Sequence, residues 1–146
     1  MAPEDLTAAK ARAARQFIQA LPHCRALGMD VLEVGEAWAL LALDYDPRFV
    51  GDPATGVLHG GVVTALLDTC CGASVMLHPA APAGTATIDL RIDYLRAAEP
   101  DKRLFARAEC YRVTRSVAFV RAVAWTRSAE EAVATAAGAY TLEGAE

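Results

Sequence analysis

The chain has 146 residues, of which 54% are hydrophobic and 22% charged, a composition typical of a single globular domain, here spanning residues 1–146. The formal net charge of −4 argues against nucleic acid as a general partner. The four cysteines form no CxxC motif and the N-terminus carries no secretory signal, so we expect buried free thiols, no metal or cofactor, and a cytoplasmic location.

The first predicted elements are a helix and a hairpin. Residues 5–21 are rich in Ala and carry apolar side chains at helical spacing, and Pro22 ends this helix. Residues 29–34 and 37–45 are apolar runs separated by a Gly-Glu pair, which predicts two short antiparallel strands.

A loop over residues 46–58, with two Pro and two Gly, leads into an apolar segment that carries one charge. Residues 60–77 (GGVVTALLDTCCGASVML) are apolar or small except for Asp68 and three hydroxyl side chains. An unpaired carboxylate removed from water is costly, so Asp68 is either satisfied by polar neighbours or kept for chemistry. The central Asp and the glycines oppose a membrane span, so we expect a helix buried inside the protein and no membrane partner.

The second half of the chain changes to a period of two. Three segments alternate apolar with polar or small residues and are predicted strands: 85–95, 103–113 and 117–127. In the first of them the alternation predicts one buried and one solvated face, the buried one formed by Ile88, Leu90, Ile92 and Tyr94. Residues 131–142 fit a helix or a strand, and a strand is favoured. The order predicts an α+β fold in which an antiparallel sheet wraps around a central helix at about residues 59–77.

The central helix opens with His59, Gly60 and Gly61. The two glycine amides are not shielded by side chains and lie at the positive end of the helix dipole, where they could polarise a carbonyl oxygen. The glycine pair is equally consistent with a tight turn into the helix. His59 is expected to brace this turn rather than to act as a base.

Gly60 and Asp68 cannot serve the same carbonyl within one helix. They are eight residues apart, about 12 Å along the helix axis. If they act together, two copies of the helix lie antiparallel across a two-fold axis, which predicts an isologous homodimer with two equivalent sites. Thr64, one turn from Asp68 on the same face, is small enough for a ligand or a partner to approach.

The sequence offers a carboxylate and a candidate oxyanion hole, but neither a Ser-His-Asp order nor a metal cluster. This combination favours hydrolysis of an activated acyl group. Asp68 would activate a water or attack as a nucleophile, while Gly60 would stabilise the developing oxyanion. A thioester suits so sparse a site, since its thiolate leaves with little help. The alternative left open is that Asp68 is a buried side chain satisfied by Thr64, by the backbone or by the dimer partner.

On these motifs the sequence resembles the PaaI-like branch of the hotdog-fold acyl-CoA thioesterases. The resemblance runs from ALGMDVLEV through GVLHGGVVTALLDTCCG and IDLRIDYLRAA to RSVAFVRAVAW. Its most specific element is the pattern H-G-G-x6-D at the start of a long apolar helix. The resemblance implies the hotdog fold, an acyl-CoA substrate, active sites shared between the subunits of a homodimer, and a dimer of dimers.

The resemblance also implies roles for individual residues. The catalytic carboxylate, the oxyanion donor, the residue that orients the loop and an assisting hydroxyl would be Asp68, Gly60, His59 and Thr87. The CoA phosphates would be met by basic side chains near the strand turns, for which Arg96 and Arg115 are the candidates. Both lie in residues 91–127, which carry nine basic and four acidic side chains.

One position departs from the pattern. Many members of the family have an Asn six residues before the His, whereas this chain has Pro53 there, preceded by Asp52. Asp52 could take the place through a shift of one residue, although a carboxylate cannot donate as an amide does. This departure leaves the positioning of the attacking water open. The second candidate function is a non-catalytic binding protein, in which the same pocket holds an acyl-CoA or a related ligand without cleaving it. A hotdog dehydratase or hydratase is disfavoured because the His-Asp spacing of those enzymes is not evident.

Overall fold

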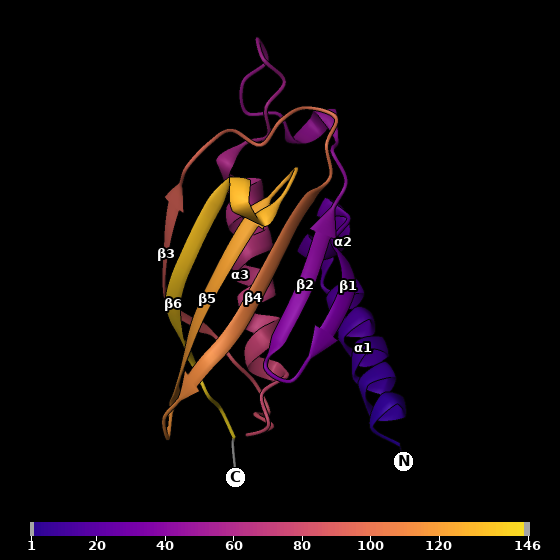
Figure 1. Ribbon diagram of the computed structural model, residues 1–146, viewed down its shortest axis with the longest axis vertical. Helices are drawn as coiled ribbons and strands as arrows, with labels where there is room; N and C mark the ends of the chain where they lie inside the picture. Colours follow the sequence, from indigo (N-terminus) through magenta and orange to yellow (C-terminus); the bar gives the residue numbers. More distant parts are fainter. Residues whose placement is uncertain (1, 145–146) are drawn as a thin grey trace.

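The computed structural model describes residues 2–144 (Figure 1). Three α-helices are present: α1 (Pro3–Ala20), α2 (Pro22–Leu27) and α3 (Gly60–Met76). The strands are β1 (Asp30–Gly35), β2 (Trp38–Leu43), β3 (Thr87–Tyr94), β4 (Leu104–Val113), β5 (Val117–Trp125) and β6 (Ala134–Thr141), and two 3-10 turns are η1 (Pro47–Phe49) and η2 (Ala129–Glu131). The strands form one antiparallel sheet in the order β1-β2-β4-β5-β6-β3.

The helix α3 runs along one face of this sheet (Figure 1). A helix that is apolar nearly all round has to be buried on most sides, and its buried side chains are Val62, Val63, Leu66, Leu67, Cys70, Cys71, Ser74 and Val75. Small side chains on β5, including the fully buried Ala118 and Ala124, let the helix lie close to the sheet. The prediction of an antiparallel sheet around a central helix is confirmed.

The N-terminal helix and the last strand also follow the prediction. Pro22 does more than end α1, because it is the first residue of the short helix α2, a position where proline is favoured. The helix α1 is tied to the edge of the sheet by Arg15, which donates to the backbone oxygens of Val31 and Leu32 at 2.8 and 3.3 Å. The ambiguous segment 131–142 forms β6, as favoured.

The predicted buried face of β3 is confirmed only in part for the single chain, because Leu90 and Ile92 are half-buried against the core whereas Ile88 and Tyr94 are not. β3 is the outer strand next to β6, and the side chains of Ile88 and Tyr94 are 56% and 52% exposed. The strict alternation is also broken, because the register shifts between Thr87 and Asp89. One extra residue on β3, a β-bulge, reverses which side chains face the helix on either side of it.

All four cysteines are free and buried, as predicted. Burial raises the pKa of Cys71 to about 12 and also raises the pKa values of Cys70 and Cys110, so these thiols stay protonated at neutral pH. Within residues 2–144, no helix has the length and the apolarity that a membrane span requires.

Candidate active site

Asp68 lies halfway along α3, and its side chain is half-buried. Its Oδ1 atom accepts a hydrogen bond from the Thr87 hydroxyl at 2.7 Å and another from the Tyr140 hydroxyl at 2.5 Å. Among residues 2–144, no protein group donates to Oδ2 and no Lys or Arg pairs with the carboxylate. One oxygen is thus fixed by two hydroxyl groups, and the other is free for a water or a substrate.

Thr87 reaches Asp68 because of the β-bulge at the start of β3. A regular strand would place Thr87 on the face opposite to Leu90 and Ile92, which pack against the core. The extra residue at Ile88 turns Thr87 toward α3 instead. The structure therefore brings together Asp68 and Thr87, the two side chains that the resemblance placed in one site.

Tyr140 on β6 is a site residue that the sequence did not indicate. Its hydroxyl lies within hydrogen-bonding distance of both Asp68 Oδ1 and, at 3.0 Å, the Asp68 backbone oxygen. The side chain is 2% exposed, and its ring lies against α3, where a Cβ on Gly72 would be 3.8 Å away. Burial in the first place, then the nearby Cys71 and Asp68, raise the pKa of Tyr140 far above its ordinary value. The phenol therefore keeps its proton at neutral pH and can donate a hydrogen bond.

At its N-terminus α3 is capped by His59, whose Nδ1 accepts from the Gly61 amide at 2.8 Å. This bond requires a glycine, because a Cβ at position 61 would lie 2.9 Å from the same nitrogen. The Gly61 amide is therefore occupied, which corrects the expectation that both glycine amides are free. The Gly60 amide donates to no group in the described part of the chain and the residue is exposed, so of the two glycine amides it is the one without a protein partner.

Thr64 does not satisfy Asp68, contrary to one of the alternatives. Its hydroxyl donates to the Gly60 oxygen at 3.0 Å and contacts the hydroxyl of Tyr94, which lies 3.3 Å from the same oxygen. These three residues close the first turn of α3 on the side of β3. A Cβ on Gly60 would meet the Tyr94 ring at 3.5 Å, an ordinary contact.

The carboxylate of Asp52 is used within its own loop. One oxygen accepts from the Ala54 amide at 3.0 Å and the other from the Thr55 hydroxyl at 2.9 Å. Such bonds stabilise a turn, so both acceptors that could have held a water have protein partners. The loop 46–58 is the projection at the top of Figure 1, beyond the N-terminal end of α3.

The two candidate arginines lie at opposite ends of the sheet. Arg96 follows β3 at the end where Tyr94 pairs with Ala134, whereas Arg115 lies in the turn between β4 and β5, next to the end where Thr87 pairs with Tyr140. Both side chains are exposed. Arg96 has a loose ion pair with Glu131 at 3.8 Å.

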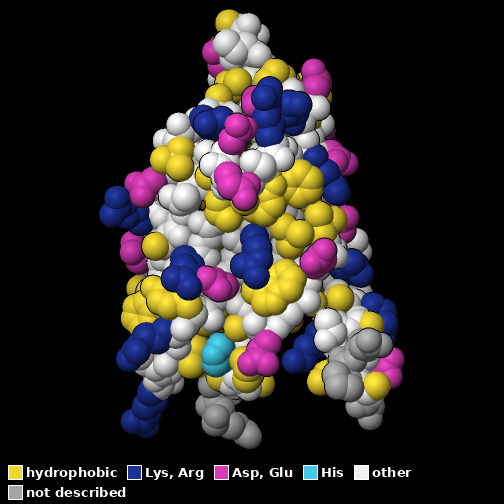
Figure 2. All heavy atoms as spheres, viewed as in Figure 1, with side chains coloured by type: hydrophobic (Ala, Val, Ile, Leu, Met, Phe, Trp, Pro, Cys, Tyr) yellow, Lys and Arg dark blue, Asp and Glu magenta, His cyan; other side chains and the backbone are white. Residues whose placement is uncertain are grey.

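Other basic residues of 91–127 are used on the sheet itself. Arg107 lies over the Trp38 ring at 4.6 Å, and Arg121 pairs with Glu109 and lies over the Tyr111 ring at 4.7 Å. Figure 2 shows basic and acidic side chains interspersed with hydrophobic ones over the face seen in Figure 1. On this face the basic side chains are therefore mixed with acidic and hydrophobic ones.

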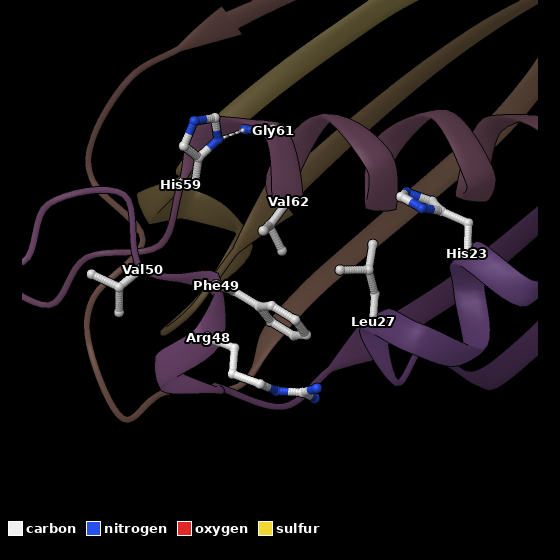
Figure 3. A pocket seen from close by; sticks show the side chains of 8 residues that line it. All are labelled: His23, Leu27, Arg48, Phe49, Val50, His59, Gly61 and Val62. Atoms are coloured by element: carbon white, nitrogen blue, oxygen red, sulfur yellow. Dashed lines mark hydrogen bonds between the residues drawn. The ribbon is translucent and has the colours of Figure 1, made fainter.

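Two cavities adjoin α3. The smaller, about 290 Å³, lies beside His59, between the helix N-terminus, η1 and α2 (Figure 3). Its space is crossed by the Phe49 ring, which points between Leu27 and Val62. The larger, about 770 Å³, lies between α1, α3 and residues 78–87, and Asp68, Thr87 and Tyr140 are part of its wall. The candidate catalytic carboxylate therefore faces the larger cavity.

Known proteins resemble this chain in both sequence and structure. Residues 55–133 match the family model described as Thioesterase superfamily. The chain is 33% identical over 118 residues to the medium/long-chain acyl-CoA thioesterase YigI of Salmonella typhimurium, over 72% of this chain and 76% of that protein. A solved structure from Pseudomonas aeruginosa is 40% identical with a TM-score of 0.81, over 90% of this chain and 98% of that one. The Escherichia coli PaaI protein from the phenylacetic acid degradation operon is 18% identical with a TM-score of 0.82, over 95% and 97%.

Proposed function

Because the chain belongs to the thioesterase superfamily, we propose that it hydrolyses an acyl-CoA to the free acid and CoA at the site around Asp68. The membership and the shared architecture confirm the predicted hotdog fold, the resemblance to PaaI-like proteins and the enzyme class. Since the relative from Salmonella is named a medium/long-chain acyl-CoA thioesterase, we extend the proposal to acyl groups of that length.

The observation that carries the proposal is the environment of the Asp68 carboxylate. Oδ1 is held by Thr87 and Tyr140, while Oδ2 has no partner in the described chain and the side chain lines a cavity of about 770 Å³. The hydroxyl groups on Oδ1 fix the orientation of the carboxylate and leave Oδ2 able to accept a hydrogen bond from a water. A fixed carboxylate with one free oxygen beside an apolar cavity is suited to acyl transfer chemistry.

In the proposed reaction, water adds to the thioester carbonyl carbon and the C–S bond breaks. As general base, Asp68 Oδ2 takes a proton from the water as its oxygen attacks, and the Gly60 amide donates to the oxyanion. Collapse of the tetrahedral intermediate expels CoA thiolate, which recovers the proton from Asp68. As nucleophile, Asp68 would instead form an acyl anhydride that water then cleaves. A covalent acyl adduct on Asp68 in rapidly quenched enzyme would identify the second route.

The proposed site is shared between two subunits. Gly60 and Asp68 are about 12 Å apart along one helix, so the oxyanion donor has to come from a second copy of α3. The outer strand β3 supports this arrangement, because Ile88, Tyr94 and Leu95 are 56%, 52% and 59% exposed there and an apolar edge strand invites pairing. A two-fold axis at β3 makes a homodimer with two sites, and we propose that two such dimers associate.

The same two-fold arrangement would bring the candidate arginines together. In one chain, Arg96 lies at the Gly60 end of the sheet and Arg115 at the Asp68 end. Antiparallel pairing places the Gly60 end of one subunit beside the Asp68 end of the other. Arg96 and Arg115 of different subunits would then flank one site, where their guanidinium groups suit the phosphates of CoA.

The test is release of free thiol from a panel of acyl-CoA esters by the purified protein. We expect turnover, and we expect Asp68→Asn to lower kcat by at least about a thousandfold while the melting temperature stays within a few degrees. Full activity of Asp68→Asn would refute the mechanism. Tight acyl-CoA binding without turnover across the panel would instead favour the binding protein, the function to which the internally paired Asp52 and the Pro53 beside it point.

A further inference from the structure

The larger cavity contains more space than the chemistry at Asp68 needs. It is about 770 Å³ in volume and is walled by α1 on one side, α3 on the other, and residues 78–87. Asp68 is the one carboxylate among its described lining residues. Two other polar lining groups are satisfied within the protein, because the Thr85 hydroxyl donates to the Thr141 oxygen at 2.7 Å and Thr69 contacts the Cys24 sulfur. Lys10 and His78 also line the cavity, and His78 Nδ1 accepts from the Ala80 amide at 3.0 Å. Most of the remaining wall is apolar, with Asp68 at one end of it.

On the α3 side the cavity follows one face of the helix. From Asp68 it passes Gly72, Ala73 and Met76 and ends at Leu77, so it runs for nine residues, about 13 Å of helix. An extended polypeptide advances about 3.6 Å per residue over three backbone bonds, which is about 1.2 Å per bond. We use the same advance per bond for an extended acyl chain. The length matches an unbranched chain of about ten or eleven bonds.

On the opposite side, α1 has the features of a wall that covers a ligand. Its small residues Ala13 and Ala14 line the cavity and leave it open. Phe17 and Leu21 also line it, yet they are 57% and 36% exposed, so two large apolar side chains are left without a partner at its border. Arg15 fixes the helix to β1, and the wall therefore has a defined position.

We infer that the acyl chain of the substrate lies in this cavity between α1 and α3, and that α1 sets the preferred chain length. This inference rests on the proposed thioesterase function. The carbonyl carbon lies at Asp68, the first methylenes pass Gly72, and the end of a chain of about ten carbons reaches Met76 and Leu77. Each buried methylene stabilises the bound chain, so activity rises with length until the cavity is full.

The experiment compares Ala13→Phe with Ala8→Phe. Ala13 is exposed and lines the cavity, while Ala8 is exposed on the same helix and does not line it. For Ala13→Phe we expect kcat/KM with decanoyl-CoA to fall at least about tenfold, the loss when roughly two methylenes leave the cavity, with less than about twofold change for butanoyl-CoA. Ala8→Phe keeps the wild-type ratio. Phe17→Ala lowers the decanoyl to butanoyl ratio as well, because it removes the cover.

An unchanged ratio in both Ala13→Phe and Phe17→Ala would overturn the inference, and it would leave the proposed function standing. Failure of the proposed function has a different signature, namely no hydrolysis of any acyl-CoA by the unmodified protein. In that case, calorimetric affinities of Asp68→Asn for the same acyl-CoA series supply the comparison without turnover. If the affinity rises with acyl length in Asp68→Asn and no longer does so once Ala13→Phe is added, the inference is supported. If the affinity still rises with acyl length after Ala13→Phe is added, the inference is contradicted. A partner subunit filling the cavity would show as affinities independent of chain length.

Discussion

The hydroxyl of Tyr140 lies 2.5 Å from Asp68 Oδ1 and 3.0 Å from the backbone oxygen of the same residue. It has one proton to share between these acceptors, and burial keeps that proton in place by raising the pKa of the phenol. Because Tyr140 belongs to β6 and Asp68 to α3, this contact fixes the carboxylate relative to the sheet as well as relative to its own helix. Thr87 donates to the same oxygen, so Oδ2 is the oxygen without a protein donor in the described part of the chain.

Removing this hydroxyl by Tyr140→Phe should slow the reaction without weakening substrate binding. A hydrogen bond to a charged group contributes about 1.5–3 kcal/mol, so we expect kcat to fall about tenfold to a hundredfold while KM changes little. Steady-state kinetics with one acyl-CoA, which give kcat and KM separately, check this expectation.

A matched control for this variant is Tyr111→Phe. Tyr111 is 51% exposed and its ring lies under Arg121 on the sheet, so loss of its hydroxyl should leave both kcat and KM unchanged. If Tyr140→Phe lowered the melting temperature but kept the wild-type kcat, Tyr140 would have a purely structural role.

The role of His59 can be separated into capping and chemistry by two substitutions. In the structure His59 Nδ1 only caps α3 through the Gly61 amide, so His59→Ala should cost about 1 kcal/mol of folding stability. His59→Asn keeps a side-chain acceptor at the cap, and we expect it to retain most of the stability and most of kcat. Denaturant unfolding and steady-state kinetics measure the two effects. A kcat for His59→Asn as low as that for His59→Ala would indicate that the imidazole takes part in the reaction.

The Gly60 amide can be removed at little cost to the fold. Gly60 is the first residue of α3, where proline is favoured, and His59 already has the extended backbone that precedes proline, with φ −60° and ψ 137°. Gly60→Pro deletes an N–H that has no partner in the described chain. We expect a melting temperature close to that of the unmodified protein and a kcat lower by about a hundredfold to a thousandfold. Gly60→Ala, which keeps the N–H, should retain more kcat, and equal losses in the two variants would point to steric exclusion instead.

The central helix and its carboxylate could be predicted from the sequence because both depend on local pattern. A run of apolar residues interrupted by Asp68 is visible in one window, and alternation identifies the strands. Thr87 was placed in the site only through the resemblance, since strict alternation puts its side chain on the wrong face. The β-bulge that corrects this depends on how β3 pairs with β6, which no single segment encodes.

Tyr140 was missed for a related reason. It is 72 residues from Asp68, in a segment whose helix or strand character was ambiguous, and only the insertion of β6 between β3 and β5 carries it beneath α3. The Gly60 and Gly61 amides look alike in the sequence. The orientation of the His59 side chain distinguishes them, because the imidazole accepts a hydrogen bond from the Gly61 amide and none from the Gly60 amide.

The arginine candidates make separate predictions about the CoA moiety. Arg115→Ala and Arg96→Ala should each raise KM for an acyl-CoA about fivefold, the effect of losing an exposed charge contact of about 1 kcal/mol. Neither should affect a pantetheine thioester, which lacks the phosphates. Arg121→Ala is the control, because Arg121 is already paired with Glu109. A KM increase that is the same for both substrates would assign these arginines to the fold instead of to the phosphates.

The shared site can be tested by combining two inactive variants. We assume that each site takes Gly60 from one subunit and Asp68 from the other. A dimer of one Asp68→Asn subunit with one Gly60→Pro subunit then has one site with both defects. Its second site has an intact Gly60 and an intact Asp68. Random reassociation gives such dimers half of the total, so we expect recovery to about a quarter of wild-type activity, measured as thiol release after co-refolding the two proteins. Each variant refolded alone should remain inactive. If the mixture is also inactive although mass spectrometry detects the mixed dimer, Gly60 and Asp68 do not act in one site across the subunits. In that case both the oxyanion assignment and the antiparallel arrangement of the two α3 helices are wrong.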